Sequence, residues 1–365
     1  MKKPNYPPMA QRMLNQSDIE HAEVVRKLNS AISRIPLAPL PLPVCVPPFQ
    51  QESLLSVVFR ASEKMGLKSP YEFLIRLGWK LNEIPRPNQI SQLGKSIGIN
   101  PRLLAASSPI TFDNKELFFY RHRLQRNHVV PSDRRICPEC VFQTGYGHRV
   151  WQLRALTVCP IHRKPLVDRC SDCQSPLSIH RQTYDKCNCE KGYTATSDVV
   201  SDAAIHLAAL IVAKFNGEDL AVHARRLGIA PDVINGMPLA GLLDLVAVMG
   251  LAQRDPAKFQ LRRIDWPVDS QIGMRHFEMS AKALTSWPNG FFERLRSLRM
   301  YQPWQESAVE VSKTLDHISR AATHHMQTDA GRFVLKGIAA FISRPSEWNE
   351  HRKQAAAEGL ECSAS

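Results

Sequence analysis

The chain has 365 residues, of which 22% are charged and 44% hydrophobic, and a formal net charge of +13 at pH 7. This length predicts two or three domains with sizeable cores, and the basic charge favours a polyanionic partner. No apolar run approaches the about 18 residues of a membrane span, because His206 and Asp244 interrupt the two longest candidates, and no secretory signal pattern is present, so we expect a cytoplasmic protein without membrane partners.

The first predicted segment, residues 1–43, combines a helix with a proline-rich linker. Ser17 is a candidate N-cap with Glu20 at the capping-box position, and apolar residues then recur on one face. The prolines that follow exclude helix and predict an extended chain. Two interpretations of the helix stay open, docking on a partner and packing on its own domain.

Residues 44–130 are predicted to form a helical domain of helix-turn-helix type. A first helix is stopped by Gly66, and Ser69-Pro70 opens the next. Residues 89–106 then read as a helix, a turn at Gly98 and a short helix opened by Pro101. This corner suits DNA reading, but many all-helical cores contain one, so its role stays open.

Residues 131–195 are predicted to hold two metal ions. Eight possible ligands fall there as four close pairs: Cys137/Cys140, Cys159/His162, Cys170/Cys173 and Cys187/Cys189. A close pair on a tight turn aims both side chains at one point, and two pairs complete a tetrahedral zinc site. We predict a tandem zinc-ribbon-like region with little regular structure and two structural Zn²⁺ ions. Sequential pairing is favoured, and interleaved pairing stays open.

Other uses of these cysteines suit the sequence less well. Seven of the nine cysteines lie between residues 137 and 189, whereas scattered core cysteines would have no reason to pair four times. Disulfide scaffolds are typical of much shorter secreted chains. The stretch has few apolar residues, so we expect metal binding to supply its folding free energy.

The basic residues are concentrated in and before the metal region. Between Leu117 and Lys191, 13 Lys and Arg face six Asp and Glu. The densest part precedes Cys137, where phosphate contact and a solvated loop are the competing interpretations, and DNA and RNA are equally suited. The candidate nucleic-acid-binding residues are Arg121, Arg123, Arg126, Arg134 and Arg135.

Residues 196–345 are predicted to be an all-α domain, followed by a polar tail at 346–365. Near its start, Gly228-Ile-Ala-Pro repeats the Gly98-Ile-Asn-Pro core of the first corner, with similar apolar neighbours. The repetition indicates a second helix-turn-helix-like corner. The overall prediction is a mainly α protein with an N-terminal helix-turn-helix unit, a central metal region and a C-terminal all-α domain.

Several motifs together resemble the TniQ/TnsD family of transposition target-selection proteins. They begin at Glu52-Ser-Leu-Leu and continue with Cys137-Pro-Glu-Cys, Trp151-Gln-Leu, Cys159-Pro-Ile-His and Cys170-Ser-Asp-Cys, so that the resemblance covers residues 48–190. The family motif implies that the same eight residues are the metal ligands of this chain. The last pair departs from the pattern of many members, in which Gly follows C-x-C at once, because Glu190 and Lys191 precede Gly192 here.

The resemblance implies an adaptor that links a target to a TnsC-like AAA+ ATPase, which recruits the transposase. The target could be a DNA site or a guide-RNA effector complex, as in CRISPR-associated transposons, and a homodimer is possible. The alternative function is a zinc-stabilised sequence-specific DNA-binding regulator. We expect no enzyme, because the chain has no Gly-rich phosphate loop, no G-x-S-x-G and no nuclease-type acid cluster.

Overall fold

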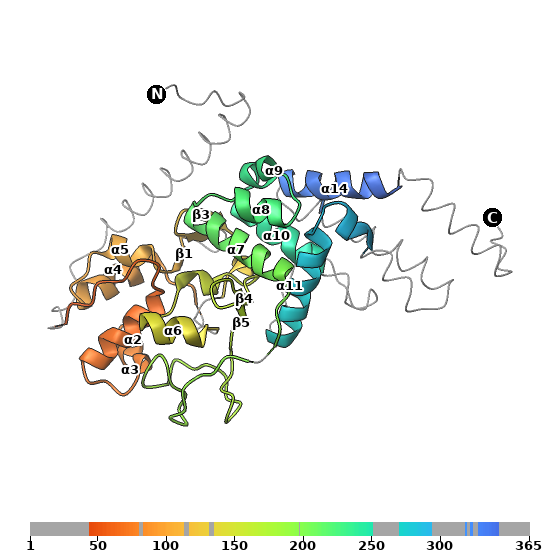
Figure 1. Ribbon diagram of the computed structural model, residues 1–365. Helices are drawn as coiled ribbons and strands as arrows, with labels where there is room; N and C mark the ends of the chain where they lie inside the picture. Colours follow the sequence, from red (N-terminus) through yellow and green to blue (C-terminus); the bar gives the residue numbers. More distant parts are fainter. Residues whose placement is uncertain are drawn as a thin grey trace, which may run out of the picture.

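The computed structural model describes residues 44–79, 83–112, 117–130, 135–196, 198–250, 270–293, 318–319, 322–323 and 328–342. The predicted helix and linker of residues 1–43 and the tail of 346–365 lie outside the described residues. The protein is mainly helical, as predicted, with the cysteine groups in its central part and helices after them (Figure 1).

Four helices form the N-terminal part: α2 (Leu54–Lys64), α3 (Pro70–Arg76), α4 (Pro87–Ser96) and α5 (Pro101–Ala105). Proline stands at the start of the last three, where its missing N–H has no intrahelical acceptor to lose. The side chain of Ser53 caps α2 by accepting a hydrogen bond from Ser56 N at 3.1 Å. Residues of these helices share one buried apolar cluster with Val46 and Ile110.

A small sheet follows, which the sequence did not suggest within the helical domain of residues 44–130. Strands β1 (Pro109–Thr111), β2 (Leu117–Phe119) and β3 (His122–Leu124) pair antiparallel, with Ile110 opposite Phe118 and Phe118 opposite Arg123. Strands of three residues are too short to show an alternating pattern, and all three residues of β2 are buried. The 3₁₀ helix η1 (Arg126–His128) ends this unit.

The central part has little regular structure, as predicted. It contains α6 (Pro138–Thr144), the 3₁₀ helix η2 (Arg149–Gln152) and the two-residue strands β4 (Val158–Cys159) and β5 (Lys164–Pro165). Isolated bridges join the loops, such as Ile136 to Val167 and Lys186 to Gly192. Short pairings of this kind leave the loops dependent on side-chain interactions for their shape.

The described C-terminal elements are helices α7 (Asp202–Asn216), α8 (Ala221–Arg226), α9 (Pro231–Gly236), α10 (Leu239–Gly250), α11 (Ser270–Leu284) and α14 (Thr328–Ile342). All 12 residues of α10 are buried, and helices α7, α11 and α14 pack around it. The N-terminal helices and helices α11 and α14 lie at opposite sides of the molecule in Figure 1. No described helix is long and apolar enough to cross a membrane.

The two corners have the same geometry, which agrees with their repeated sequence. Gly98 and Gly228 take positive φ values of 66° and 68°, a conformation that favours glycine. The following isoleucine is buried in both, and its N–H donates to the carbonyl five residues earlier, at 2.8 Å for Ile99 and 2.9 Å for Ile229. In the first corner α4 and α5 form the pair, and in the second α8 and α9.

The hydrophobic core does not break at the expected boundaries near residues 130 and 195. One cluster of buried residues runs from Leu55 to Phe341 and includes Trp151, Leu153 and Val158 of the central part. Ile179 packs against this cluster and against the cluster of the N-terminal helices. The central part is therefore packed between the two helical parts rather than standing as a separate unit.

Candidate metal centres and the surrounding surface

The first candidate metal centre consists of Cys137, Cys140, Cys159 and His162, whose ligand atoms lie within 4.8 Å of one another. His162 Nδ1 lies 3.2 Å from Cys140 Sγ and 3.4 Å from Cys137 Sγ. Cys137 is the N-cap of α6, and Pro138 starts the helix, so that Cys140 follows within the first turn. Cys159 ends β4, and His162 lies in the turn to β5.

The second candidate centre consists of Cys170, Cys173, Cys187 and Cys189, again with ligand atoms within 4.8 Å. Two tight turns shape it, because Gln174 N donates to Cys170 O at 3.0 Å and Glu190 N donates to Cys187 O at 2.9 Å. Glu190 has a φ of 65°. The residue that departs from the family pattern thus occupies a conformation that would suit glycine, and the turn still closes.

The two centres group the ligands sequentially, and either group could hold a metal ion. Hydrogen bonds from Cys137 and Cys140 lower the pKa of Cys159 to about 3, and the same coupling raises the pKa of Cys140. Several thiolates in one pocket repel one another, and a divalent cation compensates that repulsion. Three thiolates with one imidazole, or four thiolates, are donor sets that suit such a cation.

The two centres differ in exposure. In the first, Cys137, Cys140 and Cys159 are buried and belong to the large hydrophobic cluster. In the second, Cys173 and Cys189 are exposed. The first centre is therefore part of the core, whereas solvent reaches half of the ligands of the second.

The basic run before the first centre divides into exposed and buried residues. Arg121, Arg123 and Arg126 are exposed on the β2–β3 turn, β3 and η1. Arg134 lies outside the described residues. Arg135 is buried and donates through Nη2 to Arg154 O at 2.9 Å, and burial lowers its pKa to about 10. Arg135 therefore stabilises the loop ahead of Cys137 from within and lies away from any surface that phosphate could reach.

The histidines of the same run bind the C-terminal helices. His128 Nδ1 accepts a hydrogen bond from Gln125 N at 3.2 Å, so Nε2 carries a hydrogen and donates it to Asp244 Oδ1 at 2.7 Å. Both side chains are buried. His122 Nε2 lies 2.9 Å from Phe215 O at the end of α7. The sequence analysis did not predict the His128–Asp244 pair. The feature that pointed to it was the acidic residue Asp244 within the otherwise apolar sequence of α10.

The Glu52 motif forms a second buried polar link. The Glu52 carboxylate accepts hydrogen bonds from Ser56 Oγ at 2.8 Å, Arg60 Nε at 2.9 Å and Phe49 N at 2.9 Å. Ser56 Oγ also accepts from Gly147 N at 3.1 Å. The motif that carries the family resemblance thus holds the entering chain and the central part on α2.

Arg181 links the second centre to the same helix. Its side chain is 1% exposed, and its guanidinium carbon lies 4.6 Å from the centre of the Phe59 ring and 4.9 Å from that of Tyr184. Nη1 donates to Ser178 O at 2.8 Å. Cation–π contacts of this kind stabilise a desolvated guanidinium. Nothing in the spacing of the chain predicted this contact.

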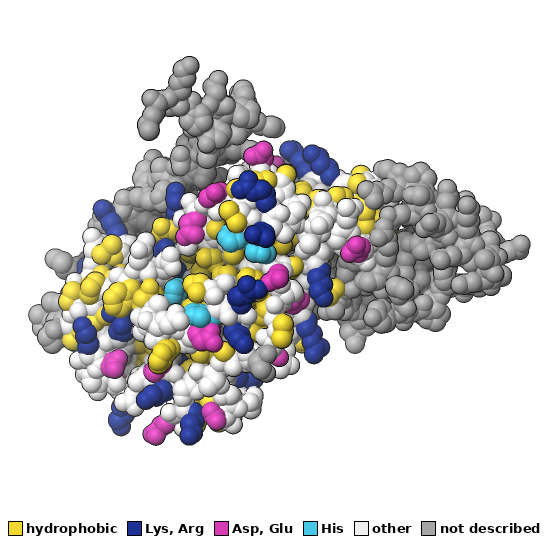
Figure 2. All heavy atoms as spheres, in the orientation of Figure 1, with side chains coloured by type: hydrophobic (Ala, Val, Ile, Leu, Met, Phe, Trp, Pro, Cys, Tyr) yellow, Lys and Arg dark blue, Asp and Glu magenta, His cyan; other side chains and the backbone are white. Residues whose placement is uncertain are grey.

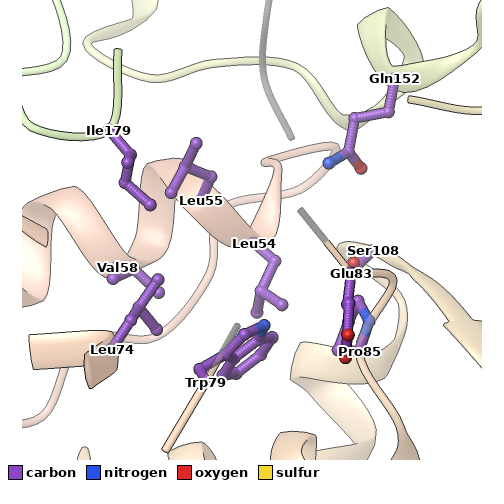
Figure 3. A pocket seen from close by; sticks show the side chains of 10 residues that line it. All are labelled: Leu54, Leu55, Val58, Leu74, Trp79, Glu83, Pro85, Ser108, Gln152 and Ile179. Atoms are coloured by element: carbon purple, nitrogen blue, oxygen red, sulfur yellow. The ribbon is translucent and has the colours of Figure 1, made fainter. Parts of the chain in front are cut away.

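A pocket lies between α2, α3 and the central part (Figure 3). Its lining is apolar apart from Glu83, Ser108 and Gln152, and Leu54, Leu74 and Trp79 form much of its wall, as the figure shows. Gln152 is 1% exposed, and its Oε1 has no hydrogen-bond partner within the described part of the chain. The pocket is an apolar seam between the N-terminal helices and the loops of the central part.

Comparison with known proteins relates this arrangement to one family. Residues 43–166 match the family model described as TniQ. No curated protein matches the chain. The matched region contains the Glu52 network, the first corner, the three-stranded sheet and all four residues of the first candidate metal centre, and it ends before the second. The chain therefore contains a region, residues 43–166, that is similar to the TniQ family.

Proposed function

We propose that this protein is an adaptor for transposition target selection, which links a target to a TnsC-like AAA+ ATPase that recruits the transposase. The observation that carries the proposal is the TniQ domain of residues 43–166, which implies a role in transposition. In this proposal the protein performs no chemistry of its own. The target is a DNA site or a guide-RNA effector complex, and the chain acts as a monomer or homodimer.

The proposal gives both candidate metal centres a structural role with Zn²⁺. Zinc prefers four cysteine or histidine donors in tetrahedral arrangement, and structural sites have no open position for a substrate. Each group here supplies four such donors from the protein. The ions would fix the loops that present the central part to its partners.

The proposal also includes nucleic acid as a partner. Arg121, Arg123 and Arg126 are exposed on neighbouring elements, where their guanidinium groups can reach phosphates. Contacts of this kind give salt-dependent affinity without sequence discrimination. They suit an adaptor that receives its target from another component as well as one that binds DNA itself.

The alternative proposal is a zinc-stabilised sequence-specific regulator, and the repeated corner is the observation that favours it. The second helices of the corners are short, with five residues in α5 and six in α9. They expose Leu103 and Val233, at 54% and 38%. Base reading is done chiefly by polar donors and acceptors, and these apolar residues occupy part of the exposed face of each short helix, so we favour the adaptor.

A pull-down of the tagged full chain from cells that express its genomic neighbours tests the proposal. We expect to recover an AAA+ ATPase, with a guide-RNA complex or a DNA site as the target. Recovery of one DNA sequence without a protein partner would instead support the regulator. A variant with Cys140→Ser serves as the control for a disrupted central part.

A further inference from the structure

A surface rich in histidine and arginine forms where the first candidate metal centre meets α7 and α8. It consists of Arg163, Asp202, His206, His223 and Arg226, which we call the histidine surface. The rings of His206 and His223 lie 6.1 Å apart. Figure 2 shows histidine and Lys/Arg side chains gathered over α7 and α8 on one face of the molecule. None of these residues belongs to the basic run that precedes Cys137.

Three separate elements position the histidine surface. Arg163 follows the ligand His162, and its N–H donates to Cys159 O at 2.9 Å, so the turn of the first centre fixes its backbone. Its side chain pairs with Asp202, the first residue of α7, and the two side chains are 61% and 78% exposed. His206 follows Asp202 by one helical turn, and α8 packs against α7 with His223 facing His206.

Positive charge predominates in this surface. The pKa of His206 is lowered, first by desolvation and then by the charges of His223 and Arg226. Arg163 acts in the same direction, and Asp202 alone opposes them. His223 Nδ1 is buried and has no hydrogen-bond partner among the described residues. Like charges this close repel one another, and an anion placed over them removes the repulsion.

We propose that the histidine surface binds the phosphodiester backbone of a nucleic acid. The inference deepens the proposed function and rests on its claim of a nucleic-acid partner. Arginine and protonated imidazole both donate hydrogen bonds to phosphate oxygens. A duplex and a single strand share this chemistry, so the test must separate DNA from RNA.

The position of the surface relative to the exposed arginines supports this. A Cβ placed on Gly217 would lie 2.6 Å from Arg121 Nη1, so the Arg121 guanidinium lies against the C-terminal end of α7. His206 is near the other end. Along α7 the two positions are separated by about 17 Å, the length of about five base pairs of B-DNA. The helix thus carries a basic group near each end.

The test measures binding of the full chain to a labelled 30-base-pair duplex and to a single-stranded RNA of equal length by fluorescence anisotropy. Arg226→Gln should weaken binding by about threefold to tenfold and lower the salt slope by about one. Asp202→Asn should tighten binding by about twofold to fivefold, because it removes the one acid and releases Arg163. Partial unfolding cannot produce such a gain.

Arg332→Gln is the matched control, because Arg332 is an arginine on α14 with a 70% exposed side chain. It removes the same charge and should leave affinity unchanged. The pH dependence gives a separate readout. Since phosphate favours protonated His206, affinity should rise as the pH falls from 7.5 to 5.5, and a variant with His206→Gln and His223→Gln should lose that rise.

Three results would overturn the inference. If both Arg226→Gln and Asp202→Asn bind nucleic acid with wild-type affinity, the contact lies elsewhere. If Arg332→Gln loses as much affinity as Arg226→Gln, the loss reflects the net charge of the protein and not a contact at this surface. If the chain binds neither nucleic acid, the nucleic-acid part of the proposed function fails with the inference. Recovery of the ATPase is measured independently, so failure of the adaptor role is distinguishable. The nucleic acid whose affinity falls more in Arg226→Gln, the DNA duplex or the single-stranded RNA, is the one that supplies the phosphates.

Discussion

The carboxylate of Glu52 is fully buried. The energetic cost of burying it depends on the groups that pair with it. Arg60 supplies two of the hydrogen bonds to the carboxylate and also donates to Pro47 O at 2.8 Å. A buried ion pair of this kind contributes little compared with an apolar pair, but removing one partner leaves an uncompensated charge. The network therefore makes the attachment of residues 44–52 to α2 sensitive to single substitutions.

We predict that Arg60→Met destabilises the protein by about 3 kcal/mol, because it leaves the Glu52 carboxylate unpaired in the core. The double variant Glu52→Met and Arg60→Met should recover part of this loss, since no buried charge remains. Urea unfolding followed by tryptophan fluorescence measures both. Lys64→Ala, on an exposed position of α2, is the control. A double variant less stable than Arg60→Met would contradict this account.

The buried pairs could not be predicted from the sequence. His128 and Asp244 are 116 residues apart, and Glu52 and Arg60 belong to a motif whose partners only the fold identifies. By contrast, the eight metal-ligand candidates were predictable, because each close pair already fixes two donors on one turn. The prediction that Arg135 binds nucleic acid was wrong, because a local count of charges does not show which side chain is buried in the core.

The two corners show how similar sequences allow different packing. The helix residue whose carbonyl accepts from the buried isoleucine N–H is Gly94 in the first corner and Ala224 in the second. A Cβ at Gly94 would lie 2.7 Å from Ile99 O and 3.0 Å from Pro101 Cγ. In the first corner the backbones approach too closely to leave room for a Cβ at residue 94, whereas the second corner has Ala224 at the equivalent position.

Gly94→Ala should therefore destabilise the N-terminal helices by about 1–3 kcal/mol, as overpacking against backbone atoms does. Ala224→Gly, the matched change in the second corner, should cost about 1–2 kcal/mol through lower helix propensity and the loss of a buried methyl group. The midpoints of urea unfolding curves measure both changes in stability. A Gly94→Ala variant as stable as the wild type would show that the corner can open without loss.

The candidate metal centres should respond differently to the loss of a ligand. Cys140→Ser removes a buried donor from the first centre, so we expect one metal ion fewer per chain together with a lower soluble yield. Cys173→Ser removes an exposed donor from the second, and we expect the same metal loss with a smaller effect on yield. Metal content per chain, measured by mass spectrometry, checks both. Unchanged content in Cys140→Ser would contradict the ligand assignment.

Helices were more predictable than strands or boundaries. Proline starts and glycine stops marked the helices of both corners, because these residues act on the local backbone. Strands β1 to β3 have three residues each, and their contacts reach helices far along the chain: β3 packs on α10, and the rings of Phe119 and Phe215 lie 4.9 Å apart. Contacts between segments so distant along the chain leave no periodic signal in it.

The extent of the core is a property of the whole chain. The TniQ match ends at residue 166, yet the buried cluster around the first candidate centre continues to Phe341. Strand β4 packs on α7, and His128 reaches α10. A domain defined by sequence similarity therefore stops in the middle of a hydrophobic core.

This arrangement predicts that a fragment of residues 43–166 cannot fold alone. Without α7 and α10 it would expose Phe119 and Val158 and leave His128 without its acceptor, and exposed apolar surface of this kind favours aggregation. A fragment of residues 43–342 retains these helices and should be soluble, bind metal and unfold cooperatively. Circular dichroism, gel filtration and metal analysis compare the two. If residues 43–166 gave a soluble, cooperatively unfolding fragment with one bound metal ion, the helices after residue 200 would be a separate unit docked on a complete domain, and the shared core would not be what stabilises the first centre.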